Sequence, residues 1–152
     1  MLAGLASPAL AGQASGTMSV SAVVIDNCSV SASPMAFQLG NAPGSSATAQ
    51  SSVALECNSP MAYEVALDAG RNPDGAHRRM ADPGTGALLT YEIYSDPSHS
   101  SRWGDRYGVD TVAGTLETDG RAILVAYGAI DPAATRLTPG TYTDTVVVTV
   151  AF

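Results

Sequence analysis

The sequence ends in Tyr142-Thr-Asp-Thr-Val-Val-Val-Thr-Val-Ala-Phe152, a run that alternates between two kinds of side chain. One phase holds the apolar residues Tyr142, Val146, Val148, Val150 and Phe152, with Asp144 as its only polar member. A period of two residues predicts a β-strand, because successive side chains of a strand point to opposite faces. The chain stops inside this apolar strand, and a bare apolar edge promotes aggregation. We therefore expect another segment to cover the outer edge of the last strand.

A second alternating run lies near the start of the chain and leads to Cys28. One phase is apolar throughout: Met18, Val20, Ala22 and Val24. The other phase begins with serine and becomes apolar at Val23 and Ile25, which predicts burial on both faces in the second half of the run. The run continues to Val30 and is longer than the usual strand of about five or six residues. We expect it to serve two roles in succession.

The middle of the chain has the same periodicity. Only 14% of the residues are charged and no helical period extends beyond two turns, so strands and turns account best for the composition. Short strands separated by glycine and proline predict an all-β sandwich with Greek-key connections. The expected strands are Ser52–Cys57, Ala62–Asp68, Leu88–Tyr94 and Ala122–Tyr127, with a shorter piece at Val112–Leu116.

The length of 152 residues fits a single domain, and the first residues predict its export. Residues 1–11 resemble the end of a secretory signal, with Ala9-Leu10-Ala11 supplying the small residues of a cleavage site. No later stretch approaches the roughly 20 apolar residues of a membrane span, so we expect none. In an oxidising compartment the two cysteines, Cys28 and Cys57, are best interpreted as one disulfide.

Charge argues against a nucleic-acid partner. The net charge is −7 and the chain contains no lysine, whereas phosphate binding requires clustered cations. The single basic pair, Arg78-Arg79, is interpreted as part of a solvated turn.

No pattern in the sequence predicts catalysis, a metal or a cofactor. His77 and His99 lie in no catalytic motif, and a Gly-x-Ser-x-Gly elbow is absent from the sequence. The series Asp68, Asn72 and Asp74 departs from the spacing of a calcium loop, so a polar turn is favoured. Trp103 is expected in the core rather than in a sugar-binding site.

Several short motifs together resemble the spore coat protein U domain family, which includes subunits of archaic chaperone-usher pili. The resemblance covers about Thr17 to Phe152. It is carried by the alternating run before Cys28 and by Met35-x-Phe37, Cys57, Arg79-Met80, Leu89-x-Tyr91-x-Ile93-Tyr94, Trp103-Gly104 and the Gly140-to-Phe152 ending.

The resemblance implies an incomplete immunoglobulin-like sandwich that lacks its final strand and is completed by a donor strand from a partner. Residues 12–25 would be the N-terminal donor extension and residues 26–152 the pilin domain. Met18, Val20, Ala22 and Val24 would enter a neighbour's groove, whose edge carries Val146, Val148, Val150 and Phe152. The implied partners are neighbouring pilin subunits, a periplasmic chaperone and an outer-membrane usher, and the product would be an extracellular pilus. A non-polymerising secreted coat protein or a single-domain adhesin is the alternative.

Overall fold

Eight strands and no helix occur in the parts of the chain that the computed structural model describes, which are residues 17–40, 46–130 and 137–152. The strands are β1 (Cys28–Ala32), β2 (Ala47–Cys57), β3 (Ala62–Leu67), β4 (Arg78–Ala81), β5 (Leu88–Tyr94), β6 (Val112–Thr115), β7 (Arg121–Ile130) and β8 (Val148–Ala151). This confirms the all-β class. The expected signal remnant, residues 1–11, lies outside the described residues, as do residues 12–16 of the expected extension. No membrane-crossing helix occurs in the three described ranges.

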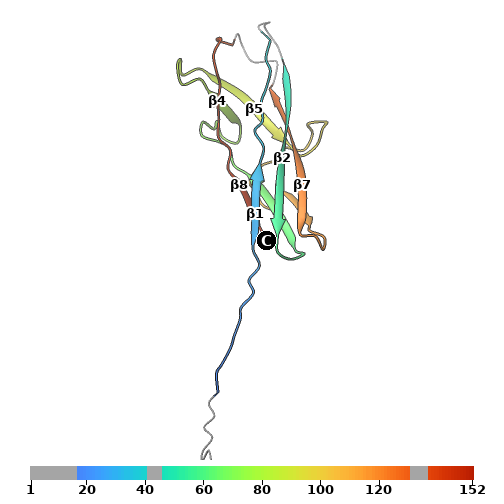
Figure 1. Cartoon of the computed structure of the whole chain (residues 1–152). Coiled ribbons are helices and arrows are strands. Elements are labelled where there is room, and N and C mark those ends of the chain that lie inside the picture. The colour runs from blue at the N-terminus through green and yellow to red at the C-terminus, as the bar shows by residue number, and fades with distance from the viewer. Residues whose placement is uncertain (1–16, 41–45, 131–136) are drawn as a thin grey trace, which may run out of the picture.

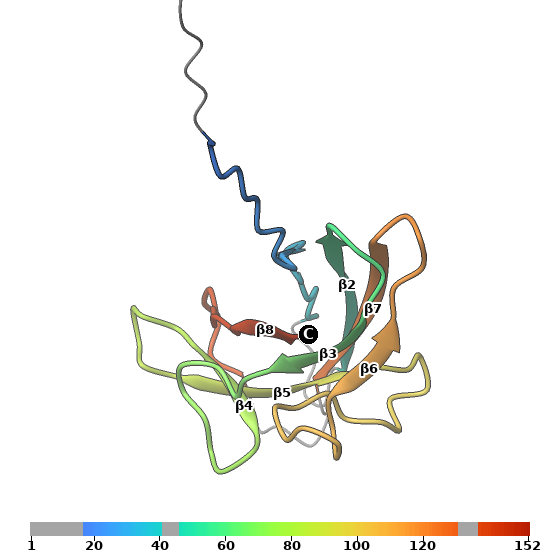
Figure 2. The ribbon, with the colours of Figure 1, turned by 90° about the horizontal axis from the view of Figure 1, so that it is seen from below.

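The strands form two antiparallel sheets around one core. The first sheet has the order β1-β2-β7-β5-β4 and the second has the order β6-β3-β8 (Figure 2). Alternation in each strand places one set of side chains between the sheets: Val53 and Leu55 of β2, for example, are almost fully buried. Trp103 is fully buried and donates a hydrogen bond from Nε1 to the Val65 carbonyl over 2.8 Å, which confirms its expected place in the core.

The two terminal runs contain less regular strand than expected. The run from Met18 to Val30 becomes strand only at Cys28, and residues 17–27 extend away from the sandwich without a strand partner (Figure 1). Val23 and Ile25 are 86% and 71% exposed, so the expectation that they are buried in this chain was wrong. A strand needs a neighbouring strand for its backbone groups, and residues 17–27 pair with none in the isolated chain; the backbone groups of Ile25 and Asn27 that are bonded have Asn58 as their partner.

The C-terminal run crosses from one sheet to the other. Thr143 exchanges two backbone hydrogen bonds with Ala81 of β4, at 2.9 and 3.0 Å, and thus extends the first sheet. From Val148 onward the chain pairs instead with β3 of the second sheet. The predicted single strand from Tyr142 to Phe152 is therefore regular only in β8, because its two halves pair with different neighbours.

Arg78 lies in the core, so its assignment to a solvated turn was wrong. Its side chain is fully buried in β4, a strand that the sequence did not predict. The guanidinium donates three hydrogen bonds of 2.8 Å to the backbone carbonyls of Leu67, Asp68 and Trp103. Nη1 lies 3.6 Å from a Glu92 carboxylate oxygen. Arg78 thereby joins β4 to the end of β3 and to the segment that carries Trp103.

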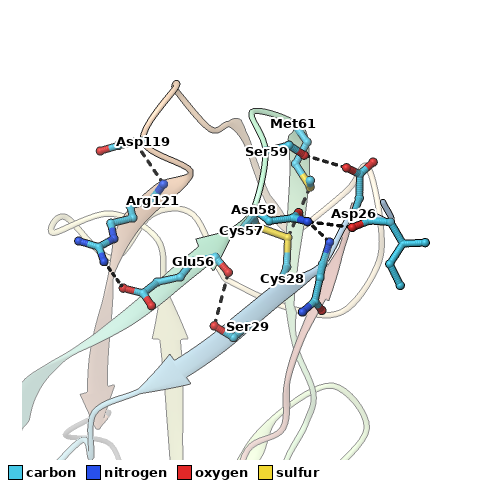
Figure 3. Close-up of a disulfide and its surroundings, with 12 residues drawn as sticks. Asp26, Cys28, Ser29, Glu56, Cys57, Asn58, Ser59, Met61, Asp119 and Arg121 are labelled. Carbon is cyan, nitrogen blue, oxygen red and sulfur yellow. Dashed lines mark hydrogen bonds and ion pairs between the residues drawn. A yellow bond between two sulfur atoms is a disulfide. The ribbon is translucent and has the colours of Figure 1, made fainter. Parts of the chain in front are cut away.

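The disulfide between Cys28 and Cys57 is confirmed. It joins β1 to β2 at paired positions of the ladder, with an S–S distance of 2.05 Å (Figure 3). Its two cysteines are 29 residues apart in the sequence. The bond therefore holds the strand that follows the N-terminal extension against the sheet.

Removing the disulfide is expected to lower the free energy of unfolding by about 3 to 4 kcal/mol, the chain-entropy value for a loop of this length. The measurement is urea unfolding of the oxidised wild type beside the double variant Cys28→Ser, Cys57→Ser. A difference below about 1 kcal/mol would show that the reduced chain keeps the two strands together without the bond.

Candidate binding groove between the first and last strands

β1 is an end strand of the first sheet and β8 is an end strand of the second sheet. Each has one edge without a strand partner, and these two edges lie next to each other. Within the described residues, β1 pairs only with β2, and β8 pairs only with β3. The two strands are neighbours (Figure 1). Some of their Cα atoms lie within 8 Å of each other, yet no backbone ladder joins β1 to β8. We call this opening the seam.

The hydrogen bonds of Val147 show which backbone groups of the C-terminal run face the seam. The Val147 carbonyl accepts a hydrogen bond from the Asp68 N–H at 3.1 Å, and the Val147 N–H donates to the Asp68 carboxylate at 2.9 Å. Alternate residues of a strand direct their peptide groups to opposite sides. The peptide groups of Val146, Val148 and Val150 therefore point away from β3 and into the seam.

The same argument applies to β1 on the other side of the seam. The Ser33 N–H donates to the Ser52 carbonyl at 2.9 Å, which places the odd-numbered residues of β1 on the β2 side. The peptide groups of Cys28, Val30 and Ala32 thus face the seam. Two rows of backbone donors and acceptors without a strand partner lie opposite each other. Paired strands lie about 4.8 Å apart, so an inserted strand could pair with both rows once β1 and β8 separate to about 10 Å.

A cavity of about 290 Å³ opens beneath the seam and reaches the core. One wall is formed by the end of β1 and the residues that come after it in the sequence, and the other wall is formed by the C-terminal run. The wall residues with apolar side chains are Ala32, Met35, Phe37, Tyr142, Val146 and Val148. The floor is formed by core residues such as Val53, Leu67 and Ile93. The cavity therefore suits apolar side chains that project from a strand lying in the seam.

Of the four predicted edge residues, two line this cavity. Val146 and Val148 line the cavity, and Val150 is half-buried and packs against the core. Phe152 follows the end of β8 and is 59% exposed, so it does not line the cavity. The opposite wall, Met35 and Phe37, was not assigned to the site from the sequence, although their alternate spacing is the signal that could have identified it.

Asp144 explains the polar break in the apolar phase of the C-terminal run. Its carboxylate accepts hydrogen bonds from the Tyr91 hydroxyl at 2.7 Å and from the Arg71 N–H at 2.9 Å. A Cβ at Gly70 would overlap this carboxylate, so only glycine fits beside it. Burial raises the pKa of Tyr91, and the hydrogen bond to Asp144 raises it further. Asp144 therefore gives one end of the cavity a polar, negatively charged lining.

Comparison with known proteins identifies the domain. A model of the Spore Coat Protein U domain matches residues 14–149. The chain belongs to this family. A chain in the crystal structure of the CsuC–CsuE chaperone-tip adhesion subunit pre-assembly complex, from archaic chaperone-usher Csu pili of Acinetobacter baumannii, is also similar. The TM-score is 0.62 at 26% sequence identity, over 85% of this chain and 40% of the other. No curated protein sequence matches the chain significantly.

The described part of the extension of this Spore Coat Protein U domain, residues 17–25, lies away from its own cavity. Met18, Val20 and Val24 are 86% to 89% exposed, and Ala22 is also exposed. The segment leaves the sandwich at the end where the disulfide lies and continues outward (Figure 1). The structure thus does not bring the four predicted donor residues to the cavity of the same chain.

The polar residues considered for catalysis or metal binding have structural partners. His77 Nδ1 lies 3.0 Å from Glu92, and the ring of His99 packs edge-on against Tyr94 at 5.2 Å. The Asp68 carboxylate accepts hydrogen bonds from the Gly70 and Val147 N–H groups. Among the described residues, no group of three or more His, Cys, Asp or Glu side chains could hold a metal ion.

Proposed function

We propose that the chain is a structural subunit of a chaperone-usher pilus that polymerises by donor-strand exchange, and that it is not an enzyme. The supporting observation is that one chain carries both halves of an intermolecular strand pairing. The seam presents two free backbone edges above an apolar cavity, while the extension presents exposed apolar side chains at alternate positions. The extension of one copy would supply the missing final strand of the next.

The pairing would be β-augmentation. Backbone hydrogen bonds to Val146, Val148 and Val150 on one side and to β1 on the other would supply affinity, and the alternate side chains would set the register. Burial of Met18, Val20, Ala22 and Val24 contributes about 5 to 10 kcal/mol before ordering costs. Each backbone pair adds about 0.5 to 1.5 kcal/mol. A joint of this strength would hold a fibre together.

The partners and location follow from the same scheme. Before assembly a periplasmic chaperone would cover the seam, and an outer-membrane usher would exchange it for the extension of another subunit. The mature fibre would lie outside the cell and serve adhesion or biofilm formation. The exposed extension favours a fibre subunit over a non-polymerising coat protein or a single-domain adhesin, because neither of these needs to donate a strand.

Deletion of residues 12–22 tests the proposed function. The truncated subunit is expected to form the chaperone complex in wild-type yield, because the seam is intact, but not to extend a fibre. Chaperone-complex yield and fibre yield are measured side by side for the two proteins. Fibre growth by the truncated subunit at the wild-type level would exclude the extension as the donor strand.

A further inference from the structure

The residues that join the extension to β1 are hydrogen-bonded to the β2–β3 turn. The Asn58 side chain uses both ends of its amide: Oδ1 accepts from the Asn27 N–H at 2.9 Å, and Nδ2 donates to the Ile25 carbonyl at 2.8 Å. The Asn58 N–H donates to the Asn27 carbonyl at 3.1 Å. Beside it, the Ser59 hydroxyl donates to the Asp26 carboxylate at 2.8 Å (Figure 3). We call Asn58 and Ser59 the clamp.

Almost no linker separates the donor residues from the clamp. It holds the backbone as far as the carbonyl of Ile25, and Val24 is the next residue. Consecutive Cα atoms are about 3.8 Å apart. When Val24 lies in the groove of a neighbouring copy, the entrance of that groove must therefore lie close to the β2–β3 turn of the copy that donates the strand.

The side chains of the extension that would point away from the groove change from polar to apolar close to the clamp. Ser19 and Ser21 are polar and suit contact with water, whereas Val23 and Ile25 present apolar side chains that are 86% and 71% exposed. With the even-numbered residues in the groove, this second apolar pair has no cover from the donor pairing itself. It lies directly beside the clamp, where two copies must approach each other.

We propose that the clamp, Val23 and Ile25 form a stiff joint between successive copies of this chain. The β2–β3 turn of the donating copy lies against the groove entrance of the receiving copy, and the side chains of Val23 and Ile25 pack between them. The turn itself, Asn58–Met61, contains no charged residue, which suits contact between two copies that each have a net charge of −7, and the neighbouring Asp26 carboxylate accepts the Ser59 hydrogen bond. This inference rests on the proposed function, since it places the extension in the groove of another copy.

The test uses fibres of the full-length chain and its Asn58→Ala variant. The variant keeps every donor residue, so its fibre yield is expected to stay within about twofold of wild type. The variant loses the two side-chain hydrogen bonds of Asn58 and keeps the Asn58 N–H and Ser59 bonds. This weakening of the clamp is expected to widen the spread of angles between successive subunits in electron micrographs by roughly twofold or more, as in a flexible linker. In the isolated subunit, amide hydrogen exchange at Asn27 is expected to rise about tenfold. Ser29→Ala, at the same end of β1, is the matched control and is expected to change neither quantity.

A second variant tests the apolar pair without touching the clamp. Val23→Ser combined with Ile25→Ser leaves the folded domain unchanged, because both side chains are exposed, and is expected to widen the angles as well. If fibres of both variants keep the wild-type spread of angles between subunits, the proposed joint is wrong, whereas the proposal of donor-strand exchange is unaffected. If the wild-type chain forms no fibres at all, the proposed function fails and the joint fails with it.

Discussion

Val20→Asp is expected to abolish fibre growth while the subunit still folds and binds its chaperone. In the proposed pairing Val20 lies at the middle of the donor phase, between Met18 and Ala22, and its side chain enters the apolar cavity of the next copy. An unpaired carboxylate buried there costs about 3 kcal/mol or more after relaxation, which weakens the pairing roughly a hundredfold. The subunit's own core is unaffected, because its Val20 is 86% exposed.

Ser19→Asp is the matched control for this prediction. Successive side chains of a strand point to opposite sides, so residue 19 faces water when residue 20 is in the groove. The same charge at position 19 is expected to leave fibre yield close to the wild-type value. Fibre yield and chaperone-complex yield are measured for both variants. Equal loss of fibres in both, or loss in neither, would show that the assigned phase of the donor strand is incorrect.

Arg78→Met is expected to cause a large loss of stability, about 3 to 5 kcal/mol. Methionine fills much of the same volume but has no donors, so three buried carbonyls lose their hydrogen bonds. Glu92 also loses one of its cationic neighbours. Burial lowers the pKa of the Arg78 guanidinium, and the nearby Arg102 cation lowers it further, but an arginine this close to Glu92 stays protonated.

Arg79→Met provides the comparison, because Arg79 is the adjacent residue in β4 and lies on the other face of the strand. Its side chain is 28% exposed and donates hydrogen bonds to the Asn72 and Pro73 carbonyls in a surface turn. The expected loss is about 1 kcal/mol or less. Urea unfolding of the two variants and the wild type measures the difference. Similar losses for both substitutions would contradict a structural role specific to Arg78.

The strands whose patterns are unambiguous could be predicted from the sequence alone. Leu88–Tyr94 was expected and found with the same bounds, and β3 ends one residue before its predicted end. Burial alternates along the whole of β5 and along β3 as far as Val65, and this pattern depends only on which face of the strand is buried. The disulfide was also predictable, because a chain with one pair of cysteines allows only one intramolecular bridge.

Arg78 shows why other features could not be read from the sequence. A charged pair is normally exposed, and a four-residue strand is too short for a periodic signal. The carbonyls that accept its hydrogen bonds belong to residues 10, 11 and 25 positions away in the sequence. Asp144 presents the same difficulty, because its partner hydroxyl on Tyr91 is 53 positions away.

The sequence by itself determined the strand-forming character of both terminal runs and the alternation of their side chains, because that periodicity is a local property of the chain. Only the tertiary structure decided what each run pairs with. The N-terminal run has the pattern of a strand yet pairs as a strand only from Cys28 onward, and the C-terminal run divides its pairing between β4 and β3. A strand's backbone hydrogen bonds are made with segments distant in the sequence, so the two free edges of the seam become visible only when both sheets are folded together.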